Sequence, residues 1–182
     1  MQKTKGFVSA VMVVVGLAAA ACASSPTTKT AGEQVDDSVT TGRVKAALVA
    51  DPTTKAHQID VETYKGKVQL NGFVDTSASK ERAGEVARNT NGVASVQNNL
   101  TVKSDPRTGA QTVDDGAITA KVKAALAGDP RVKAHQVNVE TREGVVQLSG
   151  FVESSEAKST AEELARNVDN VRSVDNEIDV KK

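Results

Sequence analysis

The chain has 182 residues, with 23 basic and 23 acidic side chains, so its formal net charge is zero. A protein that binds nucleic acid should carry a clustered basic stripe, and the sequence shows none. It has no tryptophan, one tyrosine and three phenylalanines, too few aromatics for the stacking platforms that bind single strands. Composition therefore argues against nucleic acid as a partner.

Residues 1–21 have the pattern of a secretory signal peptide. Lys3 and Lys5 precede a short apolar run that ends in small residues, which gives the expected order of basic end, apolar core and processing site. A membrane-spanning helix needs about 20 mostly apolar residues, and the run over residues 8–21 is shorter. The sequence therefore predicts export from the cytoplasm.

Cys22 follows this segment directly and is the only cysteine of the sequence, so an intramolecular disulfide cannot form. A lone thiol in an exported protein calls for a partner or a modification. Residues 17–22 resemble a bacterial lipobox, whose cysteine is acylated and becomes the mature N-terminus. We predict a lipid anchor at Cys22, and Ala23 in place of aspartate implies sorting to the outer membrane. The alternative is ordinary signal cleavage, which leaves an incidental thiol on a soluble periplasmic protein.

Beyond a polar stretch over residues 22–35, which we interpret as a flexible tether, the chain repeats itself. Residues 36–103 align without a gap with the segment 78 positions later, and 37 of the 68 aligned residues are identical. Solenoid repeats have shorter periods, of about 20–50 residues. The pattern indicates a duplicated domain, with residues 104–113 linking the copies at 36–103 and 114–182.

Each copy predicts the same order of elements. Its first segment places apolar residues at helical spacing, and we expect Asp37 and Asp115 to cap the helix N-termini. A half-buried β-hairpin follows, with its turn at Gly66 in the first copy and Gly144 in the second. A second helix and a third strand complete an αββαβ unit.

The predicted fold class is α+β, with two tandem αββαβ domains. Each domain is expected to be a three-stranded mixed sheet with two helices on one face, because strand alternation leaves the opposite face polar. Each copy buries only about a dozen medium aliphatic side chains, a small core at about 1.5–3 kcal/mol for each. We therefore expect the open faces to be covered, either by docking of the two copies or by a partner.

This constellation resembles the BON-domain family, in the type that carries two such domains and is either an outer-membrane lipoprotein or an osmotically inducible periplasmic protein. The resemblance implies a non-enzymatic envelope protein that binds phospholipid, largely through its second domain. It also implies a role in keeping the outer membrane intact under osmotic or envelope stress. The matching positions are Gly66-x-Val68-x-Leu70-x-Gly72, Ala83 and Ala87 in the first copy, and Gly144-x-Val146-x-Leu148-x-Gly150, Ala161 and Ala165 in the second.

Four residues are candidate contacts for a lipid or a partner. Strict strand alternation turns Phe73 and Phe151 to the open sheet face, where the sister domain, a lipid or a protein could meet them. The alternative is a bulge at the preceding glycine, which would bury both rings. Lys158 and Arg166 lie on the second helix of the second copy and could meet anionic headgroups. Interleaved glutamates make a solvated helix face the competing interpretation.

His57 and His135 occupy equivalent positions, but a metal site needs three or four ligands and no matching cluster accompanies them. Nucleophilic catalysis needs a base oriented by a third group, which the sequence does not show, so we expect neither an enzyme nor a cofactor. The hypothesis is a periplasm-facing lipoprotein that binds anionic phospholipid. The alternatives are a module that binds an envelope protein or a second copy, and a soluble chaperone-like protein of the periplasm.

Overall fold

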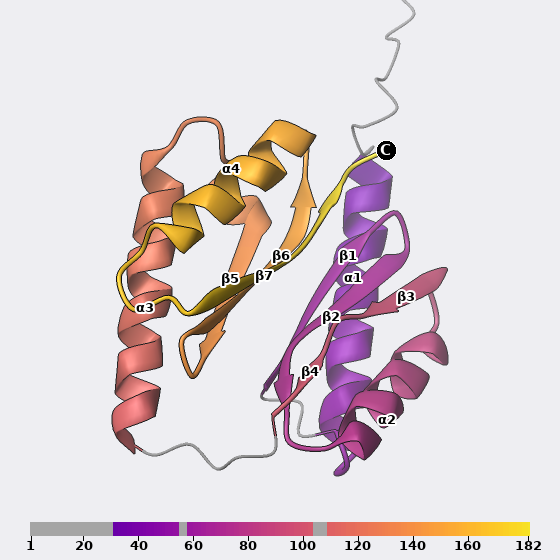
Figure 1. Cartoon of the computed structure of the whole chain (residues 1–182). Coiled ribbons are helices and arrows are strands. Elements are labelled where there is room, and N and C mark those ends of the chain that lie inside the picture. The colour runs from indigo at the N-terminus through magenta and orange to yellow at the C-terminus, as the bar shows by residue number, and fades with distance from the viewer. Residues whose placement is uncertain (1–30, 55–57, 104–108) are drawn as a thin grey trace, which may run out of the picture.

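The structure is a computed structural model that describes residues 31–54, 58–103 and 109–182. The predicted signal peptide, Cys22 and His57 lie outside the described residues. The described chain forms two αββαβ domains in tandem (Figure 1), which confirms the predicted fold class.

The first domain holds a mixed sheet in which β1 and β2 are antiparallel and β2 is the central strand. Its third strand runs parallel to β2 but is interrupted at Asn99 and Leu100, so that it forms two short pieces. The elements are α1 (Ala31–Ala50), β1 (Ile59–Tyr64), β2 (Lys67–Val74), α2 (Ser77–Arg88), β3 (Ser95–Asn98) and β4 (Thr101–Val102).

The second domain repeats this topology with an unbroken third strand. β5 and β6 form the antiparallel hairpin, and β7 pairs in parallel with β6 along its whole length. The elements are α3 (Gly109–Gly128), a 3-10 turn η2 (Ala134–Gln136), β5 (Val137–Arg142), β6 (Val145–Val152), α4 (Ser155–Arg166) and β7 (Ser173–Val180).

Each domain has its own hydrophobic core between its sheet and its two helices. In the first domain, Val44 and Leu48 of α1 pack on Val61, Val68 and Leu70 of the hairpin. The equivalent side chains of α3, β5 and β6 form a separate cluster in the second domain. The duplication therefore produces two independent cores rather than one merged core.

Both long helices begin earlier than the sequence predicted. α1 starts at Ala31 and α3 at Gly109, so residues 31–35 of the predicted tether and residues 109–113 of the predicted linker are helical. These stretches contain no proline that would stop a helix. The N-cap assignment of Asp37 and Asp115 is wrong, because both residues lie inside their helices and are buried.

The two aspartates instead fasten each long helix to the hairpin of its own domain. The carboxylate of Asp37 accepts hydrogen bonds from the backbone N–H groups of Lys65 and Gly66, at 2.8 and 2.9 Å. Asp115 accepts the same pair of bonds from the turn between β5 and β6, at 2.9 and 3.0 Å. A carboxylate that accepts backbone N–H groups makes strong, charge-assisted bonds. These bonds explain why an acid is buried at this position of both repeats.

The domains face each other through their sheets. The sheets lie in the middle of the molecule, with α1 and α2 on one outer side and α3 and α4 on the other (Figure 1). The central strands β2 and β6 are in contact across the interface. The resulting four layers leave the helices as the outer surfaces of the molecule.

Candidate functional site

Two buried glutamines, one from each repeat, join the sheets. Gln69 of β2 reaches into the second domain, where its Oε1 accepts a 3.1 Å hydrogen bond from the N–H of Gly150. Its Nε2 donates to the carbonyl oxygen of Glu177 at 3.3 Å and to Asp179 Oδ2 at 2.7 Å. Both ends of the amide are thus satisfied, as burial of a polar group requires.

The duplicate glutamine makes the reciprocal contact. Gln147 of β6 accepts a hydrogen bond from the N–H of Gly72, and its Nε2 donates to the carbonyl oxygen of Asn99 at 2.8 Å. Gln147, Gly72 and Asn99 lie 78 positions from their counterparts in the first contact, which are Gln69, Gly150 and Glu177. The interface therefore has pseudo-two-fold symmetry, in which each domain offers the same groups that it receives.

The glycine that donates in each contact has a backbone conformation that other residues avoid. Gly72 has a φ of +114° and Gly150 a φ of +123°. A Cβ atom at Gly72 would lie 2.3 Å from the carbonyl oxygen of Gln58, and one at Gly150 would lie 2.1 Å from that of Gln136. Glycine is therefore needed at the last position of the Gly-x-Val-x-Leu-x-Gly motif, where its N–H donates a hydrogen bond to the sister domain.

Both candidate phenylalanines are buried, and Phe151 lies in this interface. Phe73 and Phe151 are 3% and 8% exposed, and the parallel pairing with the third strand keeps its register past the preceding glycine, so the alternation is unchanged. The ring of Phe151 stacks on Tyr64 of the first domain, with centroids 5.3 Å apart. For Phe151, the contact found is therefore with the sister domain, one of the partners that the sequence allowed. The expectation that these rings are exposed to a lipid or an outside protein does not hold in this arrangement.

Several further contacts across the interface are polar. Lys67 Nζ forms a 2.6 Å ion pair with Asp179 of β7, although both side chains are partly exposed, so the net contribution of the pair is small. Arg142, which is 2% exposed, donates to the carbonyl oxygen of Lys103 at 2.8 Å. Its Nη1 lies 3.6 Å from Asp75 Oδ1. Hydrogen bonds therefore specify the docking of the two sheets.

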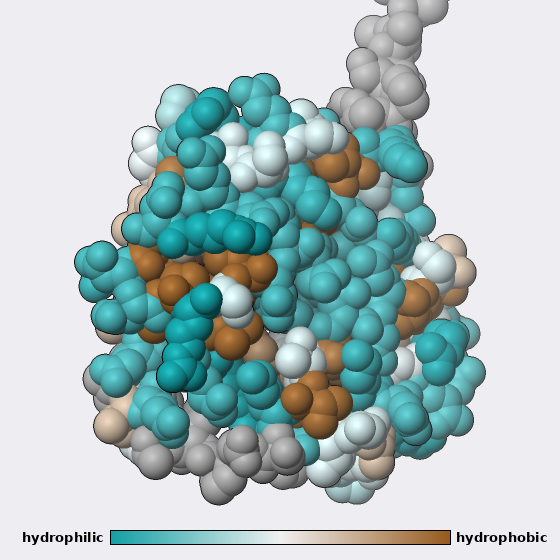
Figure 2. Space-filling model, viewed as in Figure 1, coloured by the Kyte–Doolittle hydropathy of each residue, from teal (hydrophilic) through white to brown (hydrophobic). Residues whose placement is uncertain are grey.

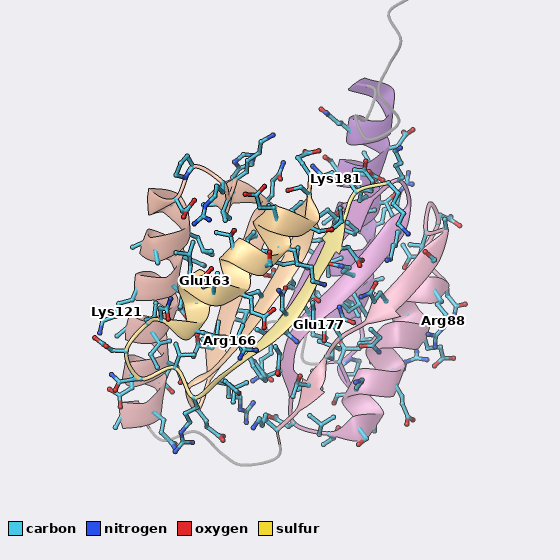
Figure 3. All side chains as sticks on the ribbon, turned by 45° about the horizontal axis from the view of Figure 1, so that its top comes forward. Arg88, Lys121, Glu163, Arg166, Glu177 and Lys181 are labelled. Carbon is cyan, nitrogen blue, oxygen red and sulfur yellow. The ribbon has the colours of Figure 1, made fainter. Side chains whose placement is uncertain are left out.

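The two candidate cations of the second domain lie on α4, and each has a partner within the domain. Lys158 Nζ donates to the carbonyl oxygen of Ile178 at 2.6 Å. Arg166, which Figure 3 shows near Glu163, forms a 2.5 Å ion pair with Glu162. A hydrogen bond from Asn176, and then the Arg166 guanidinium, lower the pKa of Glu162 below its usual value. Both cations remain candidate contacts, but nearby acids offset their charge.

The outer faces of the two long helices carry a pattern that sequence analysis missed. On α1, Val39 and Val49 are 44% and 75% exposed, Arg43 and Lys45 are exposed between them, and residues 38–50 contain no acid. The sequence does show these two valines, but helical periodicity alone does not tell whether an apolar residue faces the core or the solvent. The distinction requires knowing which side of the helix packs on the sheet.

The duplicate helix shows the same arrangement of charge with smaller apolar side chains. On α3, Ala117 and Ala127 occupy the positions of the two valines, and both are exposed. Lys121, on the outer side of the helix in Figure 3, and Lys123 replace the two α1 cations, and residues 116–128 also lack an acid. Elsewhere the face seen in Figure 2 is largely hydrophilic, with separate hydrophobic patches.

Each domain also has a hollow beside the first half of its long helix. The one in the second domain has a volume of about 360 Å³ and is lined by Asp114, Lys121 and Arg172, among others. Its counterpart in the first domain measures about 410 Å³ and is lined by Asp36 and Arg43, among others. Charges of both signs line each hollow, and the buried aspartate at each one already binds the hairpin turn.

His135 is exposed at η2. Within residues 31–54, 58–103 and 109–182, His, Cys, Asp and Glu side chains do not gather in threes as metal ligands would. Over the same part of the chain, every helix is too short or too polar to cross a membrane.

Comparison with known proteins gives matches to both repeats. A family model described as the BON domain matches residues 36–104 and 114–182. The chain is 42% identical over 152 residues to the osmotically-inducible protein Y of Escherichia coli strain K12, covering 82% of this chain and 75% of the relative. It is 34% identical over 165 residues to the outer membrane lipoprotein DolP of Haemophilus influenzae, covering 90% and 84%. A 21 kDa hemolysin of Actinobacillus pleuropneumoniae is 35% identical over 147 residues, covering 80% and 75%.

Proposed function

The chain belongs to the BON-domain family, and from this premise we propose that it is a non-enzymatic envelope lipoprotein that contacts anionic phospholipid. Acylation of Cys22 would hold it at the periplasmic face of the outer membrane. Its role would be to support the integrity of that membrane under osmotic or envelope stress. The similarity to an outer membrane lipoprotein over 90% of this chain supports this location.

The observation that carries the lipid contact is the distribution of charge on the outer helices. The open sheet faces are used by the contact between the domains, so a membrane would meet helices first. The outer faces of α1 and α3 each present two cations in a stretch without acids. Anionic leaflets attract such segments with about 1 kcal/mol for each Lys or Arg near the surface. A contact of this size is peripheral and reversible.

The anchor and the contact would reinforce each other. One acyl chain gives only marginal membrane attachment, but a lipobox cysteine carries more than one, so the anchor alone would hold the chain at the bilayer. Once the N-terminus is held in the bilayer, binding of the folded domains becomes intramolecular, with an effective concentration in the millimolar range for a short linker. The weak headgroup contact would then persist, because the anchor keeps the domains at the membrane surface.

Two measurements test the proposal. Intact-mass spectrometry of the membrane fraction should find a chain that begins at Cys22 with the added mass of acyl groups, and Cys22→Ser should abolish this species. The full chain, reconstituted in vesicles, should then show hydrogen-exchange protection on its surface that depends on phosphatidylglycerol. A mature chain with a free thiol at Cys22 would refute the anchor, and equal protection with phosphatidylcholine alone would refute the anionic contact.

A further inference from the structure

We propose that the chain rests on the anionic phospholipid surface through the outer face of α1, formed by Val39, Arg43, Lys45 and Val49. We call this set the α1 face. The inference rests on the proposed function, because it assigns the position of that same lipid contact. It places the contact on the first domain, whereas the family resemblance implies the second.

The apolar part of the α1 face is exposed in the part of the chain that the structure describes. Val39 and Val49 are 44% and 75% exposed. Among the described residues, the other large hydrophobic side chain recorded as exposed is Val102, at 38%. The two valines are ten positions apart, and at about 3.6 residues per turn their directions around the helix axis differ by about 80°. Both therefore lie on the same outward side. Their exposure is the opposite of what core packing would favour.

A cation lies one helical turn from each exposed valine. Arg43 follows Val39 by four positions, and Lys45 precedes Val49 by four, so each pair occupies neighbouring places on the helix surface. The aliphatic stems of Lys and Arg can lie along an apolar surface while their charged ends reach headgroups. No acid interrupts residues 38–50. Apolar residues beside cations on a helix surface fit an anionic interface.

The duplicated helix provides an internal comparison. α3 has two lysines at the positions of Arg43 and Lys45, but Ala117 and Ala127 stand where α1 has valines. Because binding strength grows with the apolar area that enters the interface, the α1 face should bind more tightly than its α3 counterpart. The two helices lie on opposite outer sides of the molecule (Figure 1), so a flat bilayer can meet one of them but not both.

The position of α1 in the chain favours it further. Cys22 precedes Ala31, the first residue of α1, by nine positions. An extended chain of that length spans at most about 30 Å. An anchored N-terminus therefore keeps α1 close to the bilayer, while α3 lies beyond both sheets. The anchor and the α1 face would thus act at the same side of the molecule.

The test uses the full chain reconstituted in two vesicle types, one containing phosphatidylglycerol and one of phosphatidylcholine alone. An acyl anchor attaches the chain to both, so any difference reports headgroup contact. Hydrogen exchange of peptides from α1 should slow with phosphatidylglycerol, while peptides from α3 should exchange at equal rates. Val49→Asp should reduce the protection of α1 about tenfold, because it replaces the apolar group that would enter the lipid interface with an acid. The matched Ala127→Asp should leave that protection unchanged.

The other outcomes overturn the inference, and they separate it from the proposed function. Protection of α3, or of residues 154–168 on α4, in place of α1 would move the contact elsewhere and leave the lipid function standing. Protection of α1 that is equal in both vesicle types and rises with protein concentration would identify a second copy as the occupant. Absence of any difference between the vesicles across the chain would refute the inference and the lipid function together.

Discussion

Gln69 Oε1 accepts a 3.1 Å hydrogen bond from the N–H of Gly150 across the domain interface. Its duplicate, Gln147, accepts one from Gly72, so each repeat carries both halves of the contact. When a domain with an open polar sheet face is duplicated, the sheet of each copy can therefore cover the open face of the other. This arrangement answers how a unit with so small a core can be stable.

The first prediction concerns Gln147. Gln147→Ala should lower the free energy of unfolding by about 1–3 kcal/mol, because it removes the partner of a buried N–H at Gly72 and of a partly buried carbonyl at Asn99. Chemical denaturation measures the change. Gln34→Ala removes an amide that is exposed on α1 and should shift stability by less than about 0.5 kcal/mol. Equal effects of the two substitutions would contradict the role of the interface amide.

The second prediction concerns Gly72, the glycine that donates to Gln147 and has a positive φ. Gly72→Ala should destabilise the chain by more than about 3 kcal/mol, since its Cβ would meet a backbone oxygen at 2.3 Å and its φ is +114°. Gly42→Ala serves as the control, because nothing lies within 4 Å of a Cβ there. In the interior of α1 this change should stabilise by about 1 kcal/mol. Thermal melting of both variants checks that the first change lowers stability and the second raises it.

The third prediction concerns the buried aspartate of the second domain. Asp115→Ala should cost about 1.5–3 kcal/mol, because two backbone N–H groups of the β5–β6 turn lose a charged acceptor. Hydrogen exchange at Glu143 and Gly144 should accelerate in this variant. The neighbouring Asp114 is exposed, so Asp114→Ala should leave the turn protected. If the turn still exchanges slowly without Asp115, the two hydrogen bonds to its carboxylate are not needed to hold the turn.

Much of the fold could be predicted from the sequence because the two repeats report the same periodicities independently. The order αββαβ follows from apolar residues at helical and then alternating spacing, and the structure confirms it. The starts of α1 and α3 could not be predicted, because Asp37 and Asp115 have the chemistry of N-caps. Only the tertiary structure shows that their carboxylates serve the hairpin turns.

The interface could be predicted only in outline. Alternation correctly turned Phe73 and Phe151 away from the core, and a thin core indicated that the open faces need a cover. Gln69 and Gln147 were overlooked, because a polar residue at an outward strand position usually meets solvent. Their burial comes from the sister domain, which local sequence does not describe. The α1 face was missed because its valines fit helical periodicity equally well.

The fourth prediction is a pH dependence at Asp129. The Arg131 side chain, and then its backbone N–H, donate hydrogen bonds that lower the pKa of Asp129 from 3.8 to about 2. A carboxylate with a lowered pKa stabilises the fold above its usual pKa, and this stabilisation is lost as the pH falls from about 4 towards 2. The contribution is small, because the partner side chain is 53% exposed.

A carbon-detected NMR titration of the carboxyl groups checks this prediction. Arg131→Ala should move the midpoint of Asp129 upward towards 3.8 and leave Asp51 unchanged, because the pKa of Asp51 is lowered by Arg82 on α2. A midpoint near 3.8 in the unmodified chain would show that the Asp129–Arg131 pair does not form in solution.

The central claim is that the two repeats dock sheet to sheet, so that helices form the surface offered to a membrane. Tyr64 is the only tyrosine of the sequence, and its ring stacks on Phe151 at 5.3 Å, so one pair of rings reports the docking. The most direct measurement is a nuclear Overhauser spectrum of the full chain in solution. Docked sheets predict strong cross-peaks between these two rings. Absence of those cross-peaks, with separate tumbling times for the two domains, would contradict the claim.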